Sequence, residues 1–290
     1  MEPDRTGRRS PLEWFQALDR RYIYLLFFIF VVGAHFVPLY WPVTPAKHTR
    51  DLFNTVEAVP KDKAVVVDSD WWLGIRAESE GQLRALFHHV MRRGLKLVII
   101  SWVWGPEAQK FAYDFAADVA KDYPGYEYGK DWIELSAMNK VGGAELASFA
   151  RDIHGFVKTD VFGTSLDDKE KLPMMANIRT IYDIGLVVSF SYGFDTNWIG
   201  FIQGVYGTPF GVATSAIESS TAYPFIEARQ ICGMMASAPG AAEYEQLLEL
   251  PVDRRLARQT VNVLSLAIVY VLFGILLSNL AYFSNLRKNR

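Results

Sequence analysis

The sequence has a single cysteine and almost no net charge. Cys232 cannot form an intramolecular disulfide, so a disulfide framework and a cysteine-based structural zinc site are both excluded. The 30 basic and 32 acidic residues give a net charge of −2 at pH 7, without the basic excess that displaces counterions from nucleic acid. We therefore expect no nucleic-acid partner. Half of the residues are hydrophobic, which is typical of a folded domain rather than a disordered chain or a many-span transporter.

Several motifs that carry well-known chemistry are also missing. There is no G-x-G-x-x-G and no G-x-x-x-x-G-K-[ST], the glycine patterns with which backbones cradle phosphates. There is no G-x-S-x-G elbow and no H-E-x-x-H pair. The adjacent His88 and His89 are expected on one helix, where neighbouring positions do not share a face. The sequence predicts no cofactor and no metal site.

Two long runs carry no formally charged side chain. Residues 22–40 (YIYLLFFIFVVGAHFVPLY) and 261–283 (VNVLSLAIVYVLFGILLSNLAYF) match the roughly 20 apolar residues with which a helix crosses the hydrocarbon core. A cleaved signal peptide is the alternative for the first run, but its apolar region would be shorter and end in small residues. A buried core helix is the alternative for the second, and it would normally keep a polar face. We predict transmembrane helices over 22–41 and 261–283.

Basic residues next to the first run set the expected orientation. Cytoplasmic flanks of membrane helices are enriched in lysine and arginine. Five arginines precede the run, whereas only Lys47 and Arg50 follow closely. The second run has arginines on both sides and therefore does not indicate an orientation. We therefore expect a double-pass membrane protein with both termini in the cytoplasm and the central domain outside it.

The predicted organisation has seven segments. They are a cytoplasmic N-terminal segment (1–21), a transmembrane helix (22–41), a linker (42–62), an extracytoplasmic α/β domain (63–250), a juxtamembrane linker (251–260), a second transmembrane helix (261–283) and a cytoplasmic basic tail (284–290).

The central segment alternates between strand and helix patterns. Continuous β-branched runs such as residues 64–68 (AVVVD) are typical of strands buried on both faces. Further strands are predicted at 95–102, 132–136, 184–190, 210–214 and 231–235, and helices at 78–93, 106–121, 144–153, 198–206 and 241–248. Gly94 is predicted to stop the first of these helices. Repeated alternation predicts a three-layer, mostly parallel, Rossmann-like α/β domain.

Polar side chains gather where the predicted strands end. Ligands of open parallel sheets bind beyond the carboxyl ends of the strands. The candidate ligand-binding residues at this edge are Asp68, Ser69, Asp70, Ser101, Asn139, Lys140, Ser189, Ser191, Thr214 and Glu218. Alternatively, these short polar side chains only cap the following helices and begin turns.

Two catalytic interpretations of the same edge stay open. Asp68 and Asp70 could hold a divalent cation or act in phosphoryl transfer. Ser189 and Lys140 could form a serine–lysine hydrolase pair, which requires a lysine that burial keeps neutral. The sequence assigns no catalytic residue.

Several fragments resemble a family of bacterial and archaeal membrane-anchored proteins of uncharacterised function. They are residues 129–132 (GKDW), 139–143 (NKVGG), 160–164 (DVFGT), 172–175 (LPMM), 223–224 (YP), 230–235 (QICGMM) and 240–245 (GAAEYE). The resemblance implies a Rossmann-like domain beside transmembrane helices, and it assigns no catalytic role. This chain departs from the family in having residues 235–239 (MASAP), where the family is glycine-rich.

Three functions are compatible with these features. The sequence favours a non-enzymatic binding or assembly module of a membrane complex, in contact with the lipid bilayer and with a second copy or another membrane protein. The first alternative is a tethered sensor that binds a small polar ligand. The second is a membrane-anchored hydrolase or metal-dependent enzyme.

Overall fold

The structure is a computed structural model that describes residue 14 and residues 18–36, 43–102, 106–138 and 142–288. The chain divides into two units, Met1–Pro42 with Gln259–Arg290 and Val43–Arg258. The second unit contains the sheet and most of the helices, and the first contains two apolar helical segments.

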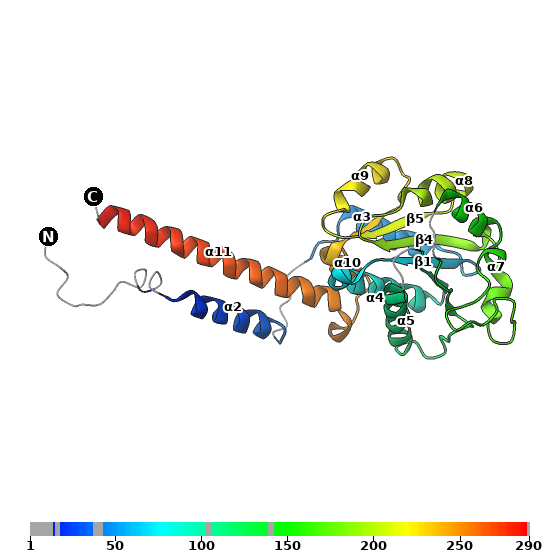
Figure 1. The fold of residues 1–290 in the computed structure, drawn as a ribbon, viewed down its shortest axis with the longest axis horizontal. Coiled ribbons are helices and arrows are strands. Elements are labelled where there is room, and N and C mark those ends of the chain that lie inside the picture. The colour runs from blue at the N-terminus through cyan, green and yellow to red at the C-terminus, as the bar shows by residue number, and fades with distance from the viewer. Residues whose placement is uncertain (1–13, 15–17, 37–42, 103–105, 139–141, 289–290) are drawn as a thin grey trace. The chain divides into compact units, whose positions relative to one another are not determined.

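A six-stranded, all-parallel sheet forms the centre of the second unit (Figure 1). Its strands are β1 (Ala64–Asp70), β2 (Lys96–Ile100), β3 (Trp132–Glu134), β4 (Ile184–Ser191), β5 (Phe210–Thr214) and β6 (Met234–Ala236). Their order across the sheet is β3-β2-β1-β4-β5-β6. The predicted α/β domain with a parallel sheet is therefore confirmed.

Helices cover both faces of this sheet. The helices of the second unit are α3 (Lys47–Ala58), α4 (Arg76–Arg93), α5 (Pro106–Ala120), α6 (Gly143–Arg151), α7 (Ile153–Phe156), α8 (Gly204–Tyr206), α9 (Ser219–Glu227) and α10 (Ser237–Leu247), with η1 (Leu73–Ile75), η2 (Pro173–Asn177), η3 (Ile181–Asp183), η4 (Trp198–Gln203) and η5 (Val252–Arg254). Figure 1 shows α4 and α5 on one face and α6 and α8 on the other.

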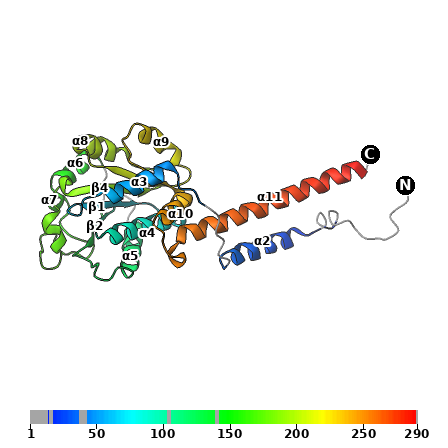
Figure 2. The same ribbon diagram turned by 180° about the vertical axis from the view of Figure 1, so that it is seen from behind.

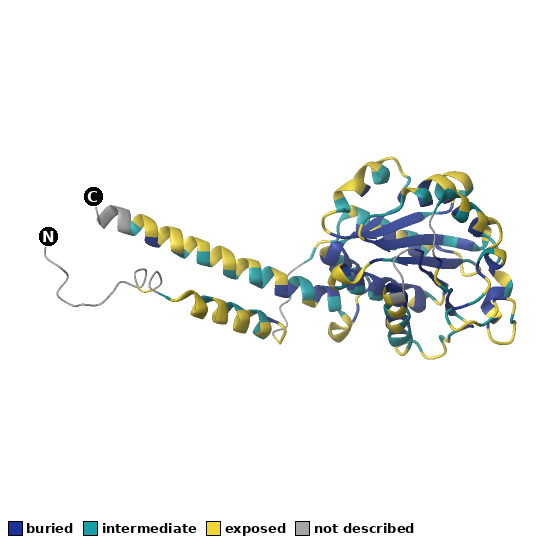
Figure 3. Cartoon of the chain, viewed as in Figure 1, coloured by how far each residue is buried: buried dark blue, intermediate teal, exposed yellow. Residues whose placement is uncertain are grey.

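The strands are buried because their residues are apolar on both sides. Val65 and Val67 point into the core under α3, α4, α5 and α10, whereas Val66 points into the core under α6 and α7. Figure 3 shows the strands almost entirely in the colour of buried residues. The sequence pattern of continuous apolar runs thus reflects a sheet that is covered on both faces.

The predicted linker over residues 42–62 contains helix α3. Leu52 and Val56 lie one helical turn apart and are both fully buried. The helix contacts β6 and lies beside α10 (Figure 2). This segment belongs to the folded unit because its apolar residues share one helix face, although the segment as a whole is polar.

A glycine and a serine adopt the same left-handed backbone conformation at two turns of the α/β unit. Gly94 ends α4 in the left-handed conformation (φ 65°), as predicted. Ser237 takes a left-handed φ of 57° at the turn from β6 into α10. The sharp strand-to-helix turn is therefore present here without the glycine that such a conformation favours.

In the first unit, helix α11 is long and apolar enough to cross a membrane. It spans Leu256–Lys288, and Leu256–Ser284 has a mean hydropathy of 2.4 in its most apolar window. Among the described residues no other helix meets the same criterion of length and composition. The predicted first transmembrane helix is described only as α2 (Arg20–Ala34), which is 15 residues long, and residues 37–41 lie outside the described part.

Candidate functional site

The strand order reverses between β1 and β4, at the centre of the sheet. β2 and β3 follow on one side of β1, and β5 and β6 follow on the other side of β4. In open parallel sheets such a switch point leaves a crevice beyond the strand ends, where ligands bind. Asp68 pairs with Ser189 here, and Asp70 pairs with Ser191. Four of the predicted residues are thus brought together at the switch point.

Asp68 is a buried carboxyl held by two hydrogen bonds. Its side chain is 2% exposed. Ser189 Oγ and Trp198 Nε1 each donate to Oδ2 over 2.9 Å. Burial raises the pKa of Asp68 well above its usual value, the charges of Asp70 and Asp195 raise it further, and the two hydrogen bonds only partly oppose this. Because Oδ2 already accepts two hydrogens, Oδ1 is the oxygen that would carry the proton in the neutral form of Asp68.

Trp198 reaches Asp68 from an unusual helical turn. It begins η4, a π-helix over Trp198–Gln203 that continues into α8. π-Helical turns are rare and often lie at functional sites. The turn places the indole N–H against the end of β1, which is 130 residues away in the chain. Sequence analysis predicted a helix here but missed Trp198 as a site residue, because nothing in a local pattern indicates a π turn.

Three buried polar atoms on the same face of the sheet as Val66 have no hydrogen-bond partner among the described residues. They are Asp68 Oδ1, Trp102 Nε1 and Ser191 Oγ. The Trp102 ring lies 6.1 Å from the ring of Trp198, between centroids, and Trp198 in turn donates to Asp68. Buried polar groups are normally paired, and each unpaired one costs about 1–3 kcal/mol. Three of them on one face of the sheet are consistent with a site that a ligand completes.

Of the other predicted residues, Thr214 pairs with Ser191 on the neighbouring strand, and the rest do not hydrogen-bond to the Asp68 side chain in the described part of the chain. Ser69 is on the opposite face of β1, where its Oγ accepts a hydrogen bond from Trp71 Nε1. Ser101 follows β2 and is buried, with no partner for its Oγ in the described part of the chain. Thr214 Oγ1 contacts Met234 Sδ, and Glu218 is half-buried at the start of α9. Asn139 and Lys140 lie outside the described residues.

The geometry bears on both catalytic interpretations. The described residues contain no group of three or more His, Cys, Asp or Glu side chains that could hold a metal ion, so Asp68 and Asp70 lack a third such ligand there. The Ser189 hydroxyl donates its hydrogen to Asp68 rather than to a basic nitrogen. Neither arrangement provides an activated nucleophile among the described residues.

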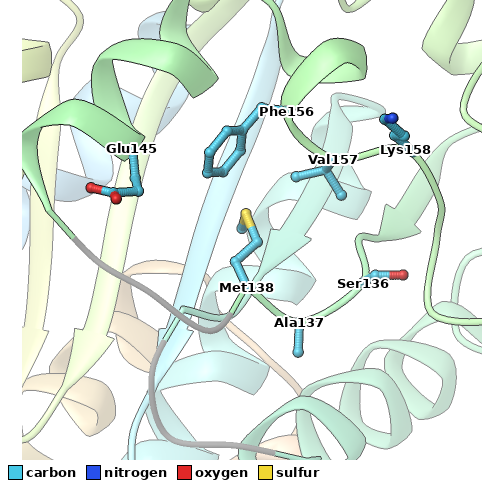
Figure 4. A pocket seen from close by; sticks show the side chains of 7 residues that line it. All are labelled: Ser136, Ala137, Met138, Glu145, Phe156, Val157 and Lys158. Carbon is cyan, nitrogen blue, oxygen red and sulfur yellow. The ribbon is translucent and has the colours of Figure 1, made fainter.

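A pocket of about 410 Å³ opens at the carboxyl end of β3 (Figure 4). It is lined by Ser136, Ala137, Met138, Glu145, Phe156, Val157 and Lys158. Its volume lies within the range of small-molecule sites, roughly 300–1,000 Å³. The ring of Phe156 lies 5.8 Å from that of Trp102, between centroids. The pocket therefore adjoins Trp102 through Phe156.

Glu134 is a second buried carboxyl that sequence analysis missed. It is 0% exposed on β3, and neither carboxyl oxygen has a partner in the described part of the chain. Burial, with a smaller contribution from the charge of Asp114, raises its pKa well above the usual value. It pairs with Ile99, whose side chain belongs to the core under α5, so it faces away from Asp68. A charged residue within a predicted buried strand was the available indication.

Comparison with known proteins adds little to the geometry. No protein-family model matches the sequence, and no curated protein matches it. Among solved structures, the chain is similar to the N-terminal domain of trehalose-6-phosphate phosphatase from Candida albicans, with 12% identity and a TM-score of 0.37. The match covers 79% of this chain and 45% of the other, so the chain spans less than half of the protein that it matches.

Proposed function

We propose that the α/β unit binds a small polar molecule at the switch point of its sheet and that the chain holds this binding domain at a membrane. The observation that carries the proposal is the group of unpartnered buried polar atoms on Asp68, Trp102 and Ser191. Buried polar atoms are normally paired, because each unpaired one costs about 1–3 kcal/mol, so three of them on one face of the sheet support a site that a ligand completes.

The atoms indicate what kind of ligand fits. Trp102 Nε1 is a hydrogen-bond donor, and a protonated Asp68 Oδ1 is a second donor. The Ser191 hydroxyl can donate or accept. The carboxylates of Asp70 and Asp195 act on Asp68 and make the site unfavourable for anions. The ligand class that fits is therefore a neutral molecule rich in hydroxyl or carbonyl oxygens.

Ser191→Ala provides the sharpest test of ligand binding. The full-length protein in mild detergent would be screened by thermal shift against sugars, nucleosides and amino acids. We expect one class to raise the melting temperature, since a ligand at a hundred times its Kd stabilises by about 2.7 kcal/mol. Ser191→Ala removes an atom without a described protein partner, so the ligand-free melting temperature should stay within about 2 °C while the ligand-induced shift falls.

Ser148→Ala is the matched control, because the Ser148 hydroxyl bonds only to the Ala144 carbonyl on the exposed side of α6. Trp102→Phe removes the indole N–H donor of Trp102 while keeping most of the ring packing. A ligand shift that survives in both Ser191→Ala and Trp102→Phe would contradict the assigned site.

For the membrane, we propose anchoring at both ends, with the termini in the cytoplasm and the α/β unit outside. Large apolar side chains of α2 and α11, such as Phe28 and Leu272, are exposed to the surroundings. Such surfaces are favourable in lipid and unfavourable in water. The arginines ahead of residue 22 support the proposed direction.

Cysteine labelling on intact cells tests this topology. The native Cys232 should react little with maleimide, because burial raises the pKa of its thiol to about 12. A membrane-impermeant maleimide should label Lys169→Cys, which lies on an exposed loop of the α/β unit, but should not label Arg8→Cys. The opposite pattern would place the domain in the cytoplasm.

Assembly with a second copy or with another membrane protein is the second candidate function. The exposed apolar residues of α11 favour it, because membrane helices associate through packing and hydrogen bonds between them. Native mass spectrometry of the detergent-released protein should then show a dimer, a higher oligomer or a fixed partner. If only a monomer is detected, the assembly function is contradicted and ligand binding is the remaining proposal.

A further inference from the structure

Exposed apolar side chains cluster beyond the carboxyl ends of β1, β4 and β5. Trp72 and Leu73 follow β1 and are each 51% exposed, and Ile217 follows β5 and is 72% exposed. Tyr192 follows β4 and is also exposed. We call these four residues the edge patch. Tryptophan and tyrosine are the residues that favour the headgroup layer of a membrane, where one end of the ring is apolar and the other wet.

Hydrogen bonds join the three loops that carry the edge patch. Glu78 Oε2, in the first turn of α4 after Leu73, accepts from the backbone N–H of Ala216 over 3.0 Å. Ser215 Oγ donates to the carbonyl oxygen of Tyr192 over 3.0 Å. The patch residues are therefore held on neighbouring loops rather than scattered over the surface.

Helix α10 holds both ends of the same unit. Glu243 accepts from the backbone N–H of Ala46, where the chain enters α3. Glu245, two residues further on, accepts from the backbone N–H groups of Ala257 and Arg258, where the chain enters α11. The points at which the chain enters and leaves the α/β unit are thus fixed to one helix.

The exit point lies close to the edge patch. A Cβ placed on Gly81 would lie 2.9 Å from Ala257 Cβ, so Ala257, near the end of the α/β unit, packs against α4. Gly81 is one helical turn from Glu78, which holds the loop of Ile217. The uncharged run begins at residue 261, only about 5 Å of helix beyond Arg258. A membrane that contains this run would lie close to the point where the chain leaves the α/β unit.

We propose that the edge patch rests on the lipid bilayer, with Trp72, Leu73, Tyr192 and Ile217 in the headgroup layer. This inference rests on the membrane anchoring proposed above. The switch-point site lies at the same edge of the sheet. The occupant of the patch is the lipid surface, because the covalent exit of the chain brings lipid there.

Site-specific quenching in nanodiscs tests the contact. Three full-length variants, Ile217→Cys, Tyr182→Cys and Ile275→Cys, would carry an environment-sensitive maleimide dye. The nanodiscs would contain phosphatidylcholine and phosphatidylglycerol, with a fraction of the lipid spin-labelled at the headgroup or along the acyl chain. Tyr182 is the matched control, because it is 67% exposed at the opposite, amino-terminal edge of the sheet, next to β4. The unmodified chain, whose only cysteine is half-buried and has a thiol pKa raised to about 12 by burial, should take up little dye.

We expect acyl-chain labels to quench the dye at residue 275, headgroup labels to quench it at residue 217 and neither to quench it at residue 182. Quenching at 275 without quenching at 217 overturns the bilayer contact and leaves the anchor in place. Equal quenching at 217 and 182 also overturns it, because no face of the unit is then preferred. Absence of quenching at 275 overturns the anchor and, with it, this inference. A protein partner on the patch would appear as protection of residue 217 from both lipid and water-soluble quenchers.

Discussion

Asp68 shows how one carboxyl can be stabilised in its neutral form by a fold. Its neighbours are strand atoms and an indole, and two hydrogen bonds reach only one of its oxygens. The ionised form loses more hydration on burial than these donors return. Such a group reduces stability at neutral pH, which a fold tolerates when the group serves binding.

We predict that Asp68→Asn stabilises the protein at neutral pH and flattens its pH dependence. The folded-state pKa of Asp68 is raised above the unfolded value near 3.9, so wild-type stability is full below that pH and is lost as pH rises towards the folded pKa. Each pH unit between the unfolded-state and folded-state pKa values corresponds to about 1.4 kcal/mol of lost stability. The asparagine side chain of the variant cannot ionise and therefore avoids this loss. Thermal melts between pH 4 and 8 measure the stability of the wild type and the variant, and Asp62→Asn, at an exposed position, is the control. A destabilised Asp68→Asn protein at pH 7 would contradict the argument.

Glu134 differs from Asp68 because both of its oxygens lack a described partner. Replacing a buried, unsatisfied carboxyl by an apolar side chain of similar length removes a desolvation cost. We therefore predict that Glu134→Met raises the free energy of unfolding by about 1–3 kcal/mol in urea titrations. Since Glu134 faces the core under α5, ligand shifts from the thermal screen should stay unchanged. Loss of those shifts would connect Glu134 to the site.

At the scale of elements, the start of α11 depends on one side chain of α10. Glu245 is 1% exposed and accepts from the N–H groups of Ala257 and Arg258 over 2.8 and 2.9 Å. Burial raises its pKa to about 7, against these hydrogen bonds and the positive charges of Arg255 and Arg258. The carboxyl is therefore protonated in the folded state through most of the acidic range.

We predict that the first turn of α11 loosens as pH rises through 7. The folded pKa lies above the usual 4.5, so stabilisation by the buried acid is full below pH 4.5 and is lost as pH passes through about 7. Hydrogen exchange of residues 251–260, corrected for the intrinsic pH effect, should therefore show reduced protection above pH 7. Glu245→Gln cannot ionise and should lack this step, while peptides from α5 serve as the internal reference. A step of equal size in Glu245→Gln would assign it to another group.

Much of the element order could be predicted because the strands are fully buried. Their apolar runs are continuous, so β5 (Phe210–Thr214) was predicted at its observed bounds and β1 within two residues. Helix α3 was missed because its stretch is polar on average, although Leu52 and Val56 already had helical spacing. The crevice residues could be placed at one edge but not assigned to partners. Trp198 joins Asp68 through a π turn, and that contact depends on tertiary packing rather than on local sequence.

At the scale of the whole molecule, the two units of the chain differ in how much apolar surface they expose. Val43–Arg258 has its own buried core on both sides of the sheet, and its chain ends are both fixed to α10. The other unit exposes most of its large apolar side chains, including those of α11. A fold that is complete in water and an apolar helix that is unfavourable there should be separable.

We predict that residues 43–258 alone form a soluble, cooperatively folded protein. The unit retains every strand and both core clusters, so its thermal unfolding should be a single transition with an enthalpy of about 150 kcal/mol, at roughly 0.7 kcal/mol per residue. Calorimetry and far-ultraviolet circular dichroism measure this.

The fragment should also give the same ligand shift as the full chain, because Asp68, Trp102 and Ser191 all lie within it. In liposome flotation it should stay with the buffer, whereas the full chain floats, because the edge patch alone lacks the α11 anchor. Gradual unfolding or aggregation of the fragment would show that the apolar unit is needed for folding, and flotation of the fragment would show that the edge patch binds lipid without the anchor.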